Sequence, residues 1–142
     1  MVDHKKQGRL NRASGKRFEK KVQADLENDG WIVMKFSKQI DLENNKLCDA
    51  KLKFNPFTHS VMYVGTGFPD FICLKIGKEA NVGDIITSEH FTKTKFVECK
   101  SNGYLKPEEK LKCDWIKKNI GPVFIAKKGD KRGEIIYTEW QN

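Results

Sequence analysis

Residues 95–100, with the sequence KFVECK, are the stretch that most constrains the fold. The short apolar run between two lysines predicts a buried strand. Successive side chains of a strand point to opposite faces, so Glu98 and Lys100 share one face and Cys99 points to the other. Burying either charge alone is costly. An acid and a base on one face of an apolar strand therefore indicate that this strand has a role beyond packing in the core.

The patterns on both sides of this strand predict one α/β domain, with a central mixed β-sheet flanked by helices. An apolar residue recurs every four positions from Phe18 to Leu26, which predicts a helix over residues 14–29. Pro107 fits the first turn of a second helix, over residues 107–119. Further strands are expected over residues 31–36, 71–74, 123–126 and 134–137.

Three stretches of the chain lack this periodicity. We expect residues 1–13 to form a flexible basic arm, and residues 14–142 to form the folded domain. Insertions into the domain are expected at about 38–66 and 77–94. In the first, residues 51–54 and 60–64 favour short strands or a hairpin, and the second is expected to be a loop or hairpin.

The charge of the chain is concentrated at its N-terminus. The 142 residues carry a formal net charge of +8, and the first 21 residues contribute +6 of it, with eight basic residues against Asp3 and Glu19. The basic residues are Lys5, Lys6, Arg9, Arg12, Lys16, Arg17, Lys20 and Lys21. This distribution favours a polyanionic partner, nucleic acid above all, although a solubilising tail is the plainer alternative.

Other classes of protein fit the sequence less well. No apolar run approaches the roughly 20 residues that cross a bilayer, and no apolar stretch follows the basic N-terminus as in a secretory signal. We therefore expect a cytoplasmic protein with no membrane association. The four cysteines show no CxxC spacing and the three histidines are scattered, which disfavours a zinc site and favours reduced thiols.

Asp70 is the natural partner of Glu98 and Lys100. It begins the preceding strand, directly after Pro69, where its carboxylate can reach the same end of the sheet. Two carboxylates with open coordination positions suit Mg²⁺ or Mn²⁺, with the Cys99 backbone carbonyl as a further ligand. A neighbouring lysine can stabilise phosphate charge or help to deprotonate an attacking water. The alternative is an ordinary Glu-Lys pair beside a turn aspartate.

The combined motifs resemble the PD-(D/E)XK nuclease superfamily, and within it the archaeal-type Holliday junction resolvases. Residues 68–70 (FPD) and 98–100 (ECK) match the two core motifs, while Gly15 and Glu19 match a glycine and a glutamate of the resolvases' first helix. The resemblance implies a restriction-endonuclease-like fold, a metal site that includes Glu19, and catalysis by Glu19, Asp70, Glu98 and Lys100. It extends over about two thirds of the chain.

The resemblance also implies where DNA binds, although the chain departs from the family in places. Ser37 falls where the resolvases carry a serine-bearing loop, and Lys110 stands close to where many relatives have a glutamine. The expected DNA-binding residues are Arg9, Arg12, Lys16, Arg17, Lys20, Lys21, Ser37 and Lys110. Both insertions are longer than the family pattern, and residues 67–70 with 105–109 also resemble the small VRR-NUC-type nucleases.

Three functions follow as hypotheses. The first is a divalent-metal-dependent DNA endonuclease that cuts branched DNA such as Holliday junctions in recombination or repair. The second is a less selective, restriction-type or viral nuclease acting on duplex or single strands, and the third is a basic nucleic-acid-binding module without catalysis. A resolvase makes two symmetric cuts, so the first hypothesis predicts a homodimer, with Tyr137 and Trp140 in part of its interface.

Overall fold

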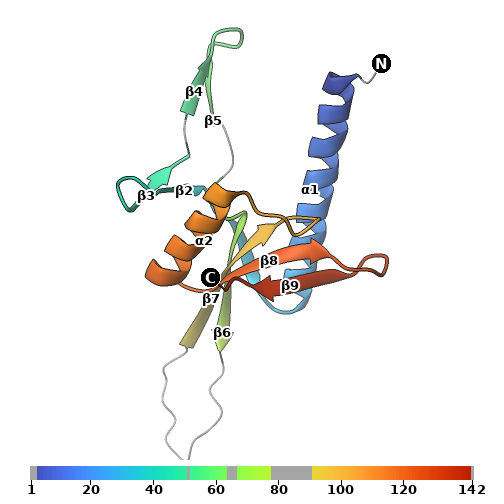
Figure 1. Ribbon diagram of the computed structural model, residues 1–142, viewed down its shortest axis with the longest axis vertical. Coiled ribbons are helices and arrows are strands. Elements are labelled where there is room, and N and C mark those ends of the chain that lie inside the picture. The colour runs from blue at the N-terminus through green and yellow to red at the C-terminus, as the bar shows by residue number, and fades with distance from the viewer. Residues whose placement is uncertain (1–2, 51, 64–66, 78–90, 142) are drawn as a thin grey trace, which may run out of the picture.

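The computed structural model describes residues 3–50, 52–63, 67–77 and 91–141 of the chain (Figure 1). Its helices and strands follow one another in the predicted order, with one hairpin that the sequence patterns do not indicate. They are α1 (His4–Asn28), β1 (Ile32–Lys35), β2 (Lys38–Asp41), β3 (Lys46–Asp49), β4 (Leu52–Asn55), β5 (Ser60–Tyr63), β6 (Phe71–Gly77), β7 (Phe91–Cys99), α2 (Pro107–Asn119), β8 (Val123–Lys128) and β9 (Ile135–Glu139).

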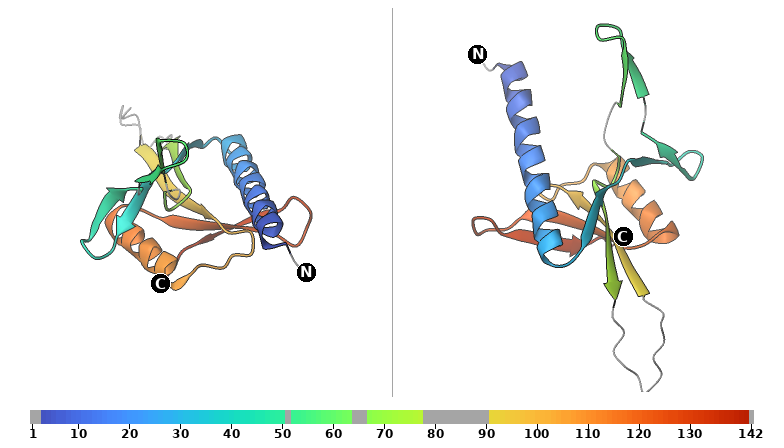
Figure 2. Two further views of the ribbon diagram at one scale, coloured as in Figure 1. Left: turned by 90° about the horizontal axis from the view of Figure 1, so that it is seen from above. Right: turned by 180° about the vertical axis from the view of Figure 1, so that it is seen from behind.

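Five of the strands form one mixed sheet in the order β1-β6-β7-β8-β9. Strands β7 and β8 run parallel, and every other neighbouring pair in this sheet is antiparallel. Helices α1 and α2 lie on opposite faces of the sheet (Figures 1 and 2). The predicted α/β domain with a central mixed sheet between helices is therefore confirmed.

Strand β7 builds both halves of the core because its side chains alternate between the two faces. Phe96 points toward α2 and packs in one apolar cluster with Cys113 and Ile116. Val97 points the other way and packs in a second cluster with Phe18 and Val22 of α1. Glu98 follows on the α2 side and is only 4% exposed, so its carboxylate lies inside the protein.

The prediction of a flexible arm over residues 1–13 is wrong for the part of it that the structure describes. Helix α1 begins at His4, ten residues before Ser14, and Asp3 caps it by accepting hydrogen bonds from the Lys5 and Lys6 N–H groups. The apolar periodicity begins only at Phe18, because the first part of α1 buries no side chain against the sheet. A helix without a packed face leaves no such periodicity in the sequence.

The first predicted insertion contains two hairpins. Strands β4 and β5 pair where short strands were predicted, with Lys51 and Val64 of those ranges outside the described residues. The hairpin of β2 and β3 was missed, although the Asn44-Asn45 turn that joins its strands is visible in the sequence. Asn45 adopts a left-handed backbone conformation there, with φ of 54°.

The second predicted insertion, at about 77–94, is partly strand. β6 and β7 pair antiparallel as far as Gly77 and Phe91, so of the two predicted alternatives, loop or hairpin, the described part of this stretch fits the hairpin. Residues 78–90 lie outside the described residues.

One end of the sheet gathers the segments that matter for function. The N-terminal end of β6 lies beside the C-terminal ends of β1, β7 and β8. The first half of α1 and the hairpin of β4 and β5 both extend away from the sheet at this same end (Figure 1).

Candidate active site

Asp70 and Glu98 are locked together by two reciprocal hydrogen bonds at this end of the sheet. The Asp70 N–H donates to Glu98 Oε2 over 3.0 Å, and the Cys99 N–H donates to Asp70 Oδ2 over 2.8 Å. The Glu98 carboxylate thus binds the backbone N–H of Asp70, and the Asp70 carboxylate binds the backbone N–H of the residue that follows Glu98. The predicted meeting of Asp70 with Glu98 takes place, and main-chain contacts rather than flexible side chains fix it.

The segment before β6 is what brings Asp70 to this position. The Phe68 N–H donates to the Lys38 carbonyl over 2.9 Å, and the Phe36 N–H donates to the Asp70 carbonyl over 3.0 Å. Gly67 passes so close to the Phe36 carbonyl oxygen that any Cβ there would collide with it. A glycine is therefore needed for this close approach, which aligns Asp70 with the end of β7.

Burial of the two carboxylates makes their ionisation unfavourable without a cation. Desolvation is the main cause that raises the pKa of Glu98, and the charge of Asp70 adds to it. Desolvation also raises the pKa of Asp70, against the hydrogen bond from Cys99, and the charge of Glu19 raises it further. A bound cation would stabilise the ionised form of both carboxylates.

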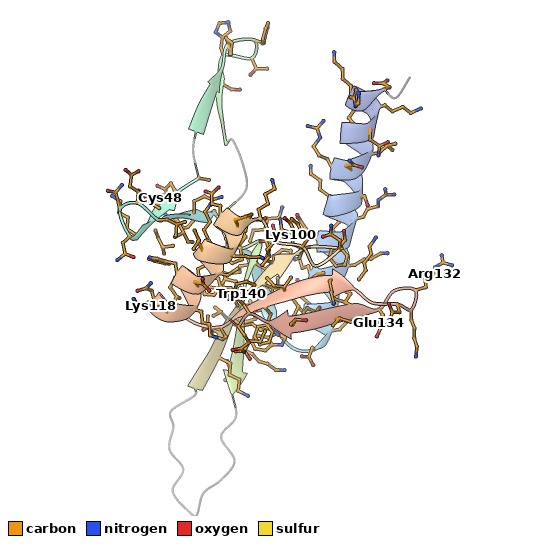
Figure 3. All side chains as sticks on the ribbon, in the orientation of Figure 1. Cys48, Lys100, Lys118, Arg132, Glu134 and Trp140 are labelled. Carbon is orange, nitrogen blue, oxygen red and sulfur yellow. The ribbon has the colours of Figure 1, made fainter. Side chains whose placement is uncertain are left out.

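Lys100 is held between two carboxylates. Its Nζ lies 3.4 Å from Glu98 Oε1 and 2.7 Å from Glu109 Oε2, at the end of the sheet between α1 and α2 (Figure 3). Burial alone would lower the pKa of Lys100, but the hydrogen bond to Glu109 and the charge of Glu98 outweigh this and raise it. Lys100 is therefore a fixed, protonated ammonium.

Glu109 is a site residue that the sequence patterns did not identify as one. It lies in the first turn of α2, where its Oε1 accepts a hydrogen bond from the Lys106 N–H over 3.0 Å. This bond leaves Oε2 free to contact Lys100. Burial alone would raise the pKa of Glu109, but the hydrogen bonds and charges of Lys100 and Lys106 together outweigh burial, so the pKa is lowered. The only signal in the sequence is a glutamate three positions after the residue that precedes a helix, a common capping pattern.

Glu19 and Ser37 also lie at the candidate site. Glu19 is partly buried on α1, and its charge acts on both Asp70 and the Cys99 thiol. Ser37 is exposed and directly follows Phe36, whose N–H binds the Asp70 carbonyl. The structure thus brings Glu19, Ser37, Asp70 and the segment 98–100 to one place.

The predicted DNA-binding residues fall into two groups. Arg9, Arg12, Lys16, Arg17, Lys20 and Lys21 are all exposed on α1, four of them before Glu19 and two directly after it. Lys110 is exposed on α2 and lines a hollow of about 340 Å³ with Tyr104 and Trp140. At the start of α2 it is Glu109, not Lys110, that contacts Lys100.

The donor set fits a hard divalent cation that keeps part of its water shell. Among the described residues, no group of three or more His, Cys, Asp or Glu side chains is arranged to hold a metal ion. Mg²⁺ is commonly held by only one or two carboxylates, with waters and substrate phosphates completing its shell. A pair of buried carboxylates beside a backbone carbonyl suits that mode of binding, and does not suit a fully protein-enclosed metal.

Comparison with known proteins adds no further constraint. No family model, curated protein or solved structure matches the chain. Neither described helix is long and apolar enough to span a membrane. The functional argument therefore rests on the geometry of the site itself.

Proposed function

We propose that the protein is a divalent-metal-dependent DNA endonuclease with a restriction-endonuclease-like fold. The observation that carries the proposal is the interlocked pair of Asp70 and Glu98 with Lys100 on the same sheet end, beside a strongly basic helix. A pure nucleic-acid-binding module has no need to bury two carboxylates inside a basic surface. Paired carboxylates beside a lysine suit metal-assisted phosphodiester hydrolysis, in which the acids hold the ion and the ammonium stabilises phosphate charge.

Asp70, Glu98 and the Cys99 backbone carbonyl would hold Mg²⁺ or Mn²⁺, with Glu19 as a further acidic group. When bound, the ion supplies a Lewis acid for the phosphate and lowers the pKa of a coordinated water. The protein's own part is to keep both carboxylates in register through the backbone bonds between β6 and β7. Preorganised charge of this kind acts without rearrangement during the reaction.

Lys100 stabilises charge in this proposal. Because its ammonium is held protonated by Glu98 and Glu109, it is a poor acceptor for a proton from the attacking water. It is well placed to interact with the negative charge that develops on a phosphate oxygen. Of the two roles considered for this lysine from sequence, the structure favours charge stabilisation.

The proposed chemistry does not by itself select one DNA structure as the substrate. The resemblance to resolvases favours branched DNA such as a Holliday junction, cut by a homodimer in recombination or repair. A less selective nuclease would use the same site. In this chain the polar atoms of Tyr137 and Trp140 already bond to Asp25 and Asp114, so these two side chains would offer a dimer mainly their apolar surfaces.

A cleavage assay with a four-way junction, linear duplex and single strand, with and without Mg²⁺, tests the function. The wild-type protein should cut at least one substrate only with Mg²⁺, and Glu98→Gln should lower the rate by more than about 100-fold, beyond the loss expected for a mere ligand-supporting residue. A second readout needs no substrate. Mg²⁺ should raise the thermal unfolding midpoint of the wild type and leave that of Glu98→Gln unchanged.

Cutting by Glu98→Gln at the wild-type rate would refute the catalytic assignment. Binding of DNA by the wild type without any Mg²⁺-dependent cutting would favour the binding module instead. A preference for the four-way junction at matched salt separates a resolvase from a general nuclease.

A further inference from the structure

The first part of α1 is a charged helix with no packed face. The buried residues of α1 are Phe18, Val22 and Leu26, all in its second part, and the helix before Phe18 extends beyond the sheet (Figures 1 and 2). From His4 to Lys21 the helix carries eight basic residues and a single acidic one, Glu19. Within the described part of the chain, none of these eight forms an ion pair with an acidic side chain.

Helical geometry divides these basic residues into two rows. With 3.6 residues per turn, five of them fall within about 100° of Glu19, all on the side away from the buried face. We name these the site row: Lys5, Arg9, Arg12, Lys16 and Lys20. The other three fall roughly 140–200° from Glu19 and form the far row: Lys6, Arg17 and Lys21.

The site row stops at the level of the candidate site. Beyond Lys20 the same line of the helix continues with Gln23 and Glu27, which bond to each other over 3.0 Å. Lys20 is thus the last member of the site row, and most of the row lies on the part of α1 before Phe18, which buries no side chain. A helix charged merely for solubility has no reason to change sign at this point.

We propose that the site row binds phosphates of a DNA duplex that leads to the candidate active site. The row spans about 22 Å at 1.5 Å per residue. A row of that length laid along a duplex covers about six base-pair steps at 3.4 Å of axis each. Because each strand winds around the axis, the row contacts phosphates of the duplex rather than an unbroken run on one strand. This inference rests on the proposed function for the site, and adds to it the path and the extent of the substrate.

The composition of this helix segment favours a duplex over a single strand. Proteins that hold single strands stack the bases on aromatic side chains, with a basic groove along the backbone. Residues 4–17 contain no Phe, Tyr or Trp. A straight row of cations without a stacking surface suits a duplex, whose own base pairing keeps the phosphates in a regular array.

The phosphates would also stabilise the helix that binds them. Like charges three or four residues apart, such as Arg12 and Lys16, destabilise a helix. Gly8 and Gly15 also form helix less readily than alanine, and a Cβ at either would meet nothing within 4 Å. Neutralisation by DNA removes the repulsion, so helix content should rise on binding.

The salt dependence of DNA binding tests the site row directly. The Glu98→Gln background prevents cutting, and two triple variants each remove three positive charges from α1. One changes the site row (Arg9→Gln/Arg12→Gln/Lys16→Gln) and the other the far row (Lys6→Gln/Arg17→Gln/Lys21→Gln). The slope of log K against log salt for a duplex should fall by about 2.7 in the site-row variant, at 0.9 for each phosphate contact. The far-row variant should lose less than half of that.

Equal losses in the two variants would overturn the inference, because both have the same net charge. So would a larger loss in the far-row variant, or tighter binding of a single strand than of a duplex of equal length at the same salt. Wild-type cutting in Mg²⁺ is measured in parallel. If the wild type cuts nothing, the proposed function fails while the two slopes still decide whether the site row binds DNA.

Discussion

The candidate active site concentrates acidic side chains, and the first half of α1 concentrates basic ones. The two sets of charged side chains differ in how far they are exposed to solvent. At the site, Glu98 is buried and Asp70 is half-buried, and backbone N–H groups and Lys100 contact three of their four carboxylate oxygens. Along the site row the cations are exposed and bond to no acidic side chain of the described residues. A buried charge must be satisfied inside the protein, whereas an exposed row is available to a partner.

In the proposed nuclease, this difference in exposure would separate two tasks. The acidic cluster must hold its geometry before the substrate arrives, because catalysis gains from groups that need not rearrange. The basic row need only attract and guide a polymer, and screening by salt sets its strength. We expect mutations at the first to change the chemical rate and mutations at the second to change binding.

The largest expected effect compares a packed and an unpacked leucine of α1. Leu26 is 2% exposed and packs against the sheet, while Leu10 is 52% exposed. Leu26→Ala should cost about 2–5 kcal/mol of unfolding free energy, because it leaves a cavity. Leu10→Ala should change stability by less than about 0.5 kcal/mol. Chemical denaturation of both variants provides the measurement, and equal losses would show that the first half of α1 is packed after all.

A smaller effect is expected from Glu109, which we assign as a positioning residue for Lys100. Glu109→Gln keeps a side-chain oxygen for the Lys106 N–H but removes the ion pair with Lys100, so kcat should fall by about tenfold with little change in KM. The pH profile should also shift, because the pKa of Lys100 falls when its partner is neutral.

Glu108→Gln is the matched control for this change. Glu108 also lies in the first turn of α2, so either variant removes one negative charge from the same helix end. Its side chain is 74% exposed and forms an ion pair with Lys112, four positions along the helix. If both variants lower kcat to the same degree, the effect belongs to the helix end and Glu109 does not position Lys100.

The smallest expected effect concerns Gly8, in the unpacked part of α1. Gly8→Ala should stabilise the helix locally by about 1 kcal/mol. Hydrogen exchange of the amides around residue 8 should slow without DNA, while the global unfolding free energy stays the same. Ala24→Gly, at an exposed position in the packed half, should instead lower global stability by about the same amount. If the amide exchange rates of Gly8→Ala are unchanged, intrinsic helix propensity does not set the local stability of this segment.

Local patterns of sequence predicted most of the fold. The period of four from Phe18 to Leu26 located the packed part of α1, the apolar run at 95–100 located the end of β7, and Pro107 located the start of α2. The outer part of α1 was missed because a helix that buries nothing has no apolar period to detect. The β2–β3 hairpin was missed for a related reason, since Ile40 is its only buried hydrophobic residue apart from the adjoining Ala50.

By itself the sequence determined which groups are available: the two acids at positions 70 and 98, the alternation that puts Glu98 and Lys100 on one face, and the excess of positive charge before residue 22. These follow from residue identity and from the short-range geometry of a strand. Only the tertiary structure decided that the Asp70 carboxylate accepts a hydrogen bond from Cys99, that Glu109 and not Lys110 reaches Lys100, and that Glu19 of α1 lies near Asp70. The physical reason is distance along the chain, because each of these relations depends on how separate elements pack, and no local pattern encodes that packing.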